Sequence, residues 1–229
     1  MAIAKNAVIV MFRKMICREL NLLFVHVPKT AGQAMEEYFL NLLGMDWKKE
    51  KAKMLCRKNR WPWKGPTRLA HLTAQEYLKY GYLNEEDFEG LFKFVFVRNP
   101  WARLVSEFEY AGHAEKGDFK SWLLERFPTI KEERGFFRSG DYRHVMPQTD
   151  YILDVKGEVM VDFVGKFENI AEDFSEVCRR MEIKSEPLPK KNVGKKKRHY
   201  SEYYEEKTRK FVSEKYALEI EMFDYSYEG

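Results

Sequence analysis

The sequence predicts an α/β fold in three layers, with a mostly parallel central sheet flanked by helices. Two apolar runs, residues 22–27 (LLFVHV) and 94–97 (FVFV), each end in a polar turn that leads into a helical pattern. Such continuous runs are typical of buried parallel strands. Strand and helix patterns alternate along the chain without a repeat or a low-complexity linker, which predicts one domain over residues 1–229.

The individual elements follow from hydrophobic spacing and from stop signals. Thr73 and Glu76 form a capping-box pattern that opens a short helix ending before Gly81. Residues 45–68 and 128–150 lack a regular period and are predicted to be irregular. The expected strands are residues 22–27, 91–97 and 159–164, and the other expected helices are residues 34–43, 101–110, 118–127, 169–181 and 201–223.

Composition indicates a packed globule. The 229 residues are 45% hydrophobic and 15% aromatic, which is enough apolar surface for a substantial core. A formal net charge of +4 with 33% charged residues is only mildly basic, so we expect no nucleic-acid partner. This charge instead suits an anionic small-molecule ligand.

Cysteine usage and the N-terminus favour a cytoplasmic protein. The three cysteines are far apart and in no metal-ligand spacing, which fits a reducing compartment: Cys17, Cys56 and Cys178. The apolar stretch at residues 7–12 is interrupted by Arg13 and Lys14. It is too short for a membrane span or a signal peptide.

Each strand-to-helix corner is predicted to bind an anion. A helix N-terminus presents unpaired backbone N–H groups and partial positive charge, and a nearby Lys29 or Arg98 adds a full charge. At the first corner the backbone of five consecutive residues can donate to one anion: Thr30, Ala31, Gly32, Gln33 and Ala34. A solvated lysine in an ordinary turn is the alternative for one corner alone, but two corners indicate a ligand with two separated anionic groups.

These residues carry a resemblance to a known family. Residues 26–32 (HVPKTAG) resemble the 5′-phosphosulfate loop of sulfotransferases that use 3′-phosphoadenosine 5′-phosphosulfate (PAPS), and residues 98–106 (RNPWARLVS) resemble their 3′-phosphate loop. Residues 164–169 (VGKFEN) and 203–225 resemble the carbohydrate and uronyl 2-O-sulfotransferases and their bacterial relatives. The resemblance spans about residues 22–227. Golgi members of this group carry a membrane anchor, so either this protein is cytoplasmic or an anchor lies outside the sequence.

The resemblance implies a P-loop-like fold and the transfer of a sulfuryl group from PAPS to a hydroxyl of a carbohydrate or similar acceptor, without a metal. It assigns Lys29 to the donor phosphosulfate and to catalysis, and it assigns Arg98 and Ser106 to the 3′-phosphate. Gln33 and Ala34 stand where the family generally has Thr and Ser, so two hydroxyl contacts are missing.

The resemblance also implies that His71 is the catalytic base. A neutral imidazole near its ordinary pKa can accept the proton of the acceptor hydroxyl. A structural histidine beside the Thr73 helix is the alternative, and Glu36 and Glu37 are rival bases. His26 is predicted to be a core residue of the first strand.

Other side chains are candidates for the acceptor site, and the acceptor itself stays open. Arg103 is predicted either to cover the sheet edge or to meet the acceptor, and residues 190–198, with six cations among nine, either form a solvated charge run or a loop that folds over an anionic ligand. Tryptophan rings suit a sugar or an aromatic alcohol equally: Trp61, Trp63 and Trp101.

Two other function classes compete, and the oligomeric state is open. A P-loop kinase or NTPase would also place a lysine after a strand, but the chain has no Gly-x-x-x-x-Gly-Lys-Ser/Thr. A non-catalytic module could bind polyanions through residues 190–198.

Overall fold

A four-stranded sheet lies at the centre of the computed structural model, which describes residues 16–17, 20–50, 59–129, 141–189 and 198–228. In the described residues the sheet order is β1-β2-β3-β4. Strands β2 (Leu22–Val25), β3 (Phe92–Val97) and β4 (Phe163–Lys166) run parallel, and β1 (Ile16–Cys17) pairs antiparallel with β2. The predicted α/β fold with a mostly parallel sheet is therefore confirmed.

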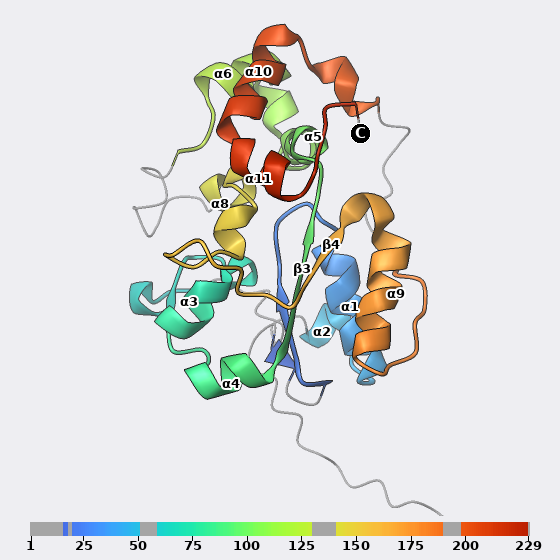
Figure 1. Cartoon of the computed structure of the whole chain (residues 1–229). Helices are drawn as coiled ribbons and strands as arrows, with labels where there is room; N and C mark the ends of the chain where they lie inside the picture. Colours follow the sequence, from blue (N-terminus) through green and yellow to red (C-terminus); the bar gives the residue numbers. More distant parts are fainter. Residues whose placement is uncertain (1–15, 18–19, 51–58, 130–140, 190–197, 229) are drawn as a thin grey trace, which may run out of the picture.

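Each parallel strand leads into a helix. Helix α1 (Gly32–Leu42) follows β2, α5 (Pro100–Tyr110) follows β3, and α9 (Ile170–Arg180) follows β4 after one turn of 3-10 helix. Helices α1 and α9 lie on one side of the sheet, and α3 (Ala74–Lys79) and α4 (Glu85–Gly90) lie on the other (Figure 1). The remaining helices are α2 (Trp47–Glu50), α6 (Phe119–Glu125), α8 (Asp141–Val145), α10 (Glu206–Lys215) and α11 (Ala217–Met222).

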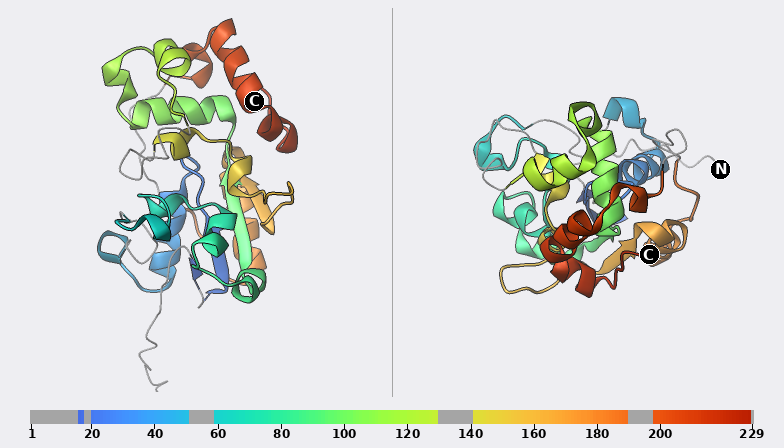
Figure 2. Two further views of the ribbon diagram at one scale, coloured as in Figure 1. Left: turned by 90° about the vertical axis from the view of Figure 1, so that its left-hand side faces the viewer. Right: turned by 90° about the horizontal axis from the view of Figure 1, so that it is seen from above.

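Two clusters of buried side chains hold the molecule together. The larger one packs both faces of the sheet against its helices. The smaller one lies among α5, α6, α10 and α11, which we call the helical cap. The cap sits beyond the end of β3 in Figure 1 and in the left view of Figure 2. Because α5 leaves directly from β3, the carboxyl edge of the sheet faces the underside of the cap.

Side-chain caps fix where several helices begin. The predicted capping box is confirmed: Glu76 N–H donates to Thr73 Oγ1 at 3.2 Å, and Thr73 N–H donates to Glu76 Oε2 at 3.0 Å. Asn99 caps α5 and Asp118 caps α6 by accepting hydrogen bonds from N–H groups three residues on. These bonds satisfy N–H groups that a helix start otherwise leaves unpaired.

Several predicted boundaries are wrong. The last helix, expected over residues 201–223, is divided into a 3-10 turn, α10 and α11, because Glu205 caps α10 and the chain leaves helical geometry at Tyr216. Residues 159–162 lie outside β4, which begins at Phe163. Helix α4 was missed although Asn84 caps it, and residues 45–68 and 128–150 contain α2 and α8.

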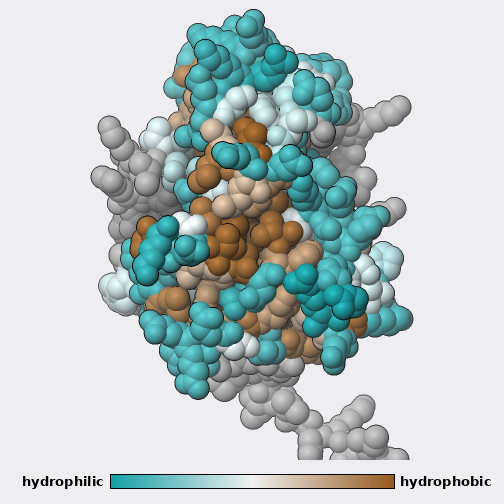
Figure 3. Space-filling view, in the orientation of Figure 1, coloured by the Kyte–Doolittle hydropathy of each residue, from teal (hydrophilic) through white to brown (hydrophobic). Residues whose placement is uncertain are grey.

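Hydrophobic residues gather at the centre of the face shown in Figure 3, around β4 and the segment that leads into it. The exposed large hydrophobic side chains of that segment and of α11 are Val155, Val159, Leu218 and Met222. Within the described part of the chain, every helix is too short or too polar to cross a membrane.

Candidate active site

Backbone conformation shapes the loop between β2 and α1. Lys29 and Ala31 have φ angles of 73° and 67°, in the left-handed region that non-glycine residues rarely adopt. The Thr30 hydroxyl donates to Val27 O at 2.8 Å and fixes the turn. Ala31 is the N-cap of α1. Since alanine has no side-chain acceptor, the N–H groups of Gly32 and Gln33 are left to water or to a ligand. The N–H of Ala34, which the sequence predicts to donate to the anion, donates to Ala31 O at 2.9 Å instead.

Gly32 lies directly against the His26 ring. A Cβ atom at this position would lie 2.0 Å from His26 Nε2, far inside contact distance. The His26 ring is buried and cannot swing away, because its Nδ1 lies 2.8 Å from the buried Glu36 carboxylate. A side chain at position 32 would therefore displace either the ring or the loop.

Side chains from distant segments shape the loop between β3 and α5. The Gln148 amide accepts from Arg98 N–H at 2.8 Å and donates to Arg98 O at 2.7 Å. The Glu168 carboxylate accepts from Asn99 N–H at 2.8 Å, and the Asn99 amide donates to Ser226 O at 2.8 Å. The stretch around Glu168 and the C-terminal segment thus meet at this corner.

The two corners are joined by Arg98. Its Nη1 donates to Lys29 O at 3.2 Å, and its guanidinium lies 4.2 Å from the centroid of the Phe167 ring. Burial lowers the pKa of Arg98, while the nearby Glu168 and Tyr225 oppose that shift. The structure therefore brings the two predicted anion-binding corners into contact.

The Lys29 side chain extends from the first corner to helix α5. Lys29 Nζ lies 3.5 Å from the centroid of the Tyr110 ring, at the end of α5. Ser106 is part-buried and stands one helical turn before Tyr110, so both residues share a face of the helix. The predicted donor lysine thus reaches the face of α5 that carries the predicted phosphate-binding serine.

His71 lies against the end of β2, in the 3-10 turn Leu69–His71. Its Nδ1 is 3.1 Å from His26 O. A carbonyl oxygen can only accept, so Nδ1 carries the proton and Nε2 presents the lone pair that a general base needs. Burial lowers the pKa of His71 well below its ordinary value, and positive charge on His26, His144 and Arg143 adds to the shift.

The rival carboxylates are less available than His71. Glu36 has no exposed surface and is paired with His26, so it cannot reach an acceptor. Glu37, the next residue of α1, is part-buried. His26 is buried as predicted, but it follows β2, which ends at Val25, and its ring lines the site.

Three other predicted candidates are buried or lie mostly outside the described residues. Arg103 is fully buried and donates to His144 O at 3.2 Å and to Met146 O at 2.8 Å, so it has no exposed surface with which to meet an acceptor. That it covers the sheet edge stays a prediction. Trp101 is buried in the helical cap, and its indole donates to Arg209 O at 3.3 Å. Of the basic run, residues 190–197 lie outside the described residues.

Three residues that shape this region were not predicted from the sequence. Gln148 holds Arg98, and His144 and Glu107 form a buried pair beside His71, with His144 Nδ1 2.9 Å from Glu107 Oε1. Two of them belong to residues 128–150, which the absence of periodicity predicted to be irregular. The one local signal that could have indicated a site in this stretch is the Arg143-His144 pair.

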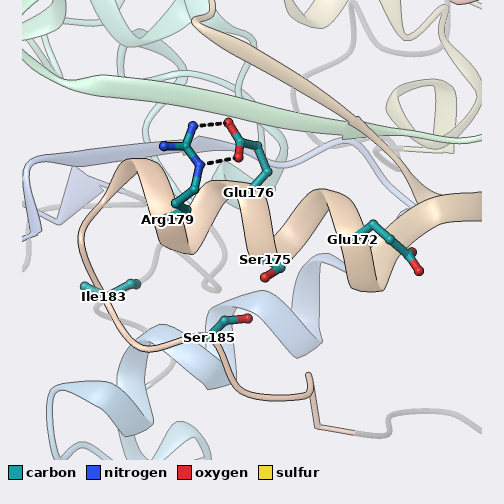
Figure 4. A pocket seen from close by; sticks show the side chains of 6 residues that line it. All are labelled: Glu172, Ser175, Glu176, Arg179, Ile183 and Ser185. Atoms are coloured by element: carbon teal, nitrogen blue, oxygen red, sulfur yellow. Dashed lines mark hydrogen bonds and ion pairs between the residues drawn. The ribbon is translucent and has the colours of Figure 1, made fainter.

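A hollow of about 520 Å³ beside α9 lies away from this region. None of its lining residues comes from the loops after β2 and β3, and its charged side chains include the ion pair of Glu176 with Arg179 (Figure 4). Within the described residues, no group of three or more His, Cys, Asp or Glu side chains is arranged to hold a metal ion.

Comparisons with known proteins identify the family. No solved structure matches the chain. An uncharacterized protein from Archaeoglobus fulgidus is 31% identical over 102 residues, which cover 43% of this chain and 74% of that protein. The model of the sulfotransferase family matches residues 13–226, which include both corners, His71 and the stretch around Glu168. The chain belongs to the sulfotransferase family.

Proposed function

We propose that this protein transfers the sulfuryl group of PAPS to a hydroxyl of a carbohydrate or similar acceptor. Family membership supports sulfuryl transfer in general. The observation that carries the donor is the hydrogen bond from Arg98 to Lys29 O, because it joins two cationic helix starts into one site for a molecule with two anionic ends. Gly32 has no Cβ, and the His26 ring occupies that space, so the buried ring packs directly against the start of α1.

In this reaction the acceptor oxygen bonds to sulfur while the bond from sulfur to the 5′-phosphate oxygen breaks, which releases 3′-phosphoadenosine 5′-phosphate (PAP). His71 Nε2 takes the proton of the acceptor hydroxyl. Lys29 and the N–H groups that begin α1 stabilise the negative charge that grows on the departing phosphate. Arg98 and Ser106 hold the 3′-phosphate, so the donor is fixed at both ends.

An exposed aromatic pair supports a carbohydrate acceptor. Trp61 and Trp63 are 53% and 66% exposed, and their ring centroids lie 5.0 Å apart. The Asn59 amide donates to three carbonyl groups of this loop, and Tyr82 OH donates to Lys64 O, so the loop is rigid. Exposed indole faces on a hydrogen-bonded loop suit the apolar face of a sugar ring, and they suit an aromatic alcohol as well.

Ligand-induced stabilisation tests the donor against the rival functions. PAP at about 100 times its Kd should stabilise the folded chain by about 2.7 kcal/mol and raise its Tm. ATP with magnesium should do so if the protein is a P-loop enzyme, and heparin alone should do so if it only binds polyanions. A Tm that rises with ATP and magnesium and stays constant with PAP would refute the proposal. Transfer of label from [35S]PAPS to a panel of glycans then identifies the acceptor.

A further inference from the structure

Two imidazoles flank His71, and a carboxylate stands behind each of them. The ring centroids of His26 and His144 lie 4.6 Å and 5.1 Å from that of His71, and both contacts are edge-on. His26 Nδ1 lies 2.8 Å from Glu36 Oε1, and His144 Nδ1 lies 2.9 Å from Glu107 Oε1. The row of five side chains joins α1, the end of β2, the turn before α3, α8 and α5.

His144 is held at two points by one helix. Glu107 of α5 accepts from its ring, and Arg103, one turn earlier on α5, donates to its backbone carbonyl at 3.2 Å. All three residues are buried, with exposed fractions of 8%, 3% and 0% for His144, Glu107 and Arg103. Because a carboxylate only accepts, it fixes the proton on Nδ1 and sets the orientation of the ring.

A purely structural role for this row of side chains would not require buried ionisable groups. Burying ionisable side chains costs desolvation energy that apolar residues of similar volume avoid. Such groups gather where a protein must control proton affinity. Here they gather around a base candidate whose Nε2 carries a lone pair, and the helix that supplies Glu107 and Arg103 also supplies Ser106 and starts at the Arg98 corner.

We propose that His144, backed by Glu107, is a positioning residue for His71. It packs edge-on against the His71 ring and holds that ring with Nε2 turned away from the His26 carbonyl, where it can accept the acceptor's proton. The inference rests on the proposed function, because it assumes that His71 is the base.

The charged environment of His71 fixes the direction of the expected effect. The charged and titratable groups around His71 come from every element packed on it: His26 and Glu36, His144 and Glu107, Arg143 and Glu76. Arg143 donates to His71 O and makes a two-pronged ion pair with Glu76, so its charge is constant over the neutral range. Positive charge on His144 contributes to the lowered pKa of His71. Removing it must therefore raise that pKa.

The test is a His144→Asn variant, followed by nuclear magnetic resonance of the His71 ring nitrogens from pH 4 to pH 9 in the full chain. The asparagine amide can still donate to Glu107, but it cannot titrate. We expect the pKa of His71 to rise by roughly one pH unit relative to the wild type. An unchanged His71 titration in the folded variant would overturn the inference, even if Tm falls. If His144→Asn does not fold, His144→Gln tests the same shift.

A matched control tests whether the effect is specific to the His144–Glu107 pair. Glu109→Gln removes a carboxylate two residues from Glu107 on the same helix, where it accepts from Tyr203 OH at 2.8 Å, and should leave the His71 titration unchanged. Activity can be measured with [35S]PAPS and an acceptor that the protein sulfates. In His144→Asn, the acidic limb of the kcat profile should move to higher pH together with the His71 pKa, while the Kd for PAP stays constant. The titration needs no activity, so a protein that sulfates nothing would refute the proposed function and leave this measurement valid.

Discussion

The two strand-end corners are built by different means. After β2, the loop is shaped by its own backbone: Lys29 and Ala31 are left-handed, Thr30 bonds to the carbonyl three residues earlier, and Gly32 packs against His26. After β3, the loop is held by side chains that are far away in sequence. Gln148 is 50 residues from Arg98, and Glu168 is 69 residues from Asn99.

This difference separates two tasks. In the proposed reaction, the first corner and His71 surround the place where bonds change, and the backbone of the loop would hold its N–H groups fixed while charge develops. The second corner presents a guanidinium, whose planar fork suits a phosphate that stays intact. We therefore expect substitutions at the first corner to affect turnover and substitutions at the second corner to affect donor affinity.

His71→Ala should have the largest effect. Loss of a general base typically lowers turnover by about 10²–10⁴-fold, while PAP affinity should stay within about twofold because His71 lies outside both corners. The wild-type rate should fall as the pH drops below the lowered pKa of His71, since protonation of Nε2 removes the base. This acidic limb should lie below the ordinary histidine range. An acidic limb that persists in the variant would point to Glu37.

Lys29→Ala should lower turnover by about 10²–10³-fold at saturating donor, because the ammonium acts on charge that grows in the transition state. The measurement is kcat with [35S]PAPS beside PAP affinity by calorimetry. Lys48→Ala, a substitution in the short helix α2, is the matched lysine control. If Lys29→Ala weakened PAP binding and kept the wild-type kcat, the first corner would be a binding site and the comparison would fail.

Arg98→Ala should weaken PAP binding by about 1.5–3 kcal/mol, which is the usual loss for a hydrogen bond to a charged group. Turnover at saturating donor should change less than affinity. Arg179→Ala on the exposed side of α9 removes an arginine that pairs with Glu176 and should leave PAP affinity unchanged. Equal PAP affinity of folded Arg98→Ala and wild type, measured by calorimetry, would remove the 3′-phosphate from this corner.

The features that sequence predicted are the local ones. An apolar run, a cation and a helix start follow one another within a few residues, so the sheet, both corners and the Thr73 capping box could be read from spacing. The roles of Lys29, Arg98, Ser106 and His71 remain predictions, although the structure places them around the two corners. The resemblance located His71, because nothing in its immediate neighbours distinguishes it from a structural histidine.

The missed features depend on contacts that spacing does not report. Glu107 and His144 are 37 residues apart, and only the packing of α8 against α5 brings them together. Arg103 illustrates the opposite error: a cation about one turn beyond a ligand loop is a candidate for meeting the acceptor, yet Arg103 donates to two buried backbone carbonyls. Likewise, an unbroken hydrophobic stripe at residues 201–223 conceals the break at Tyr216.

Gly32→Ala should have the smallest effect, which is a loss in the free energy of unfolding. It is also the most direct test of the comparison between the two corners. The new methyl group would lie 2.0 Å from His26 Nε2, and Glu36 keeps the ring from moving, so the loop must shift. Overpacking of this kind typically costs about 1–3 kcal/mol of stability. Gly90→Ala is the matched control, because a Cβ at Gly90 would meet nothing within 4 Å. Urea unfolding should show the loss at position 32 alone, together with weaker PAP binding. If Gly32→Ala kept the stability and the PAP affinity of the wild type, the backbone at Gly32 would not determine the shape of the first corner. The distinction between a corner shaped by backbone and a corner held by side chains would then fail.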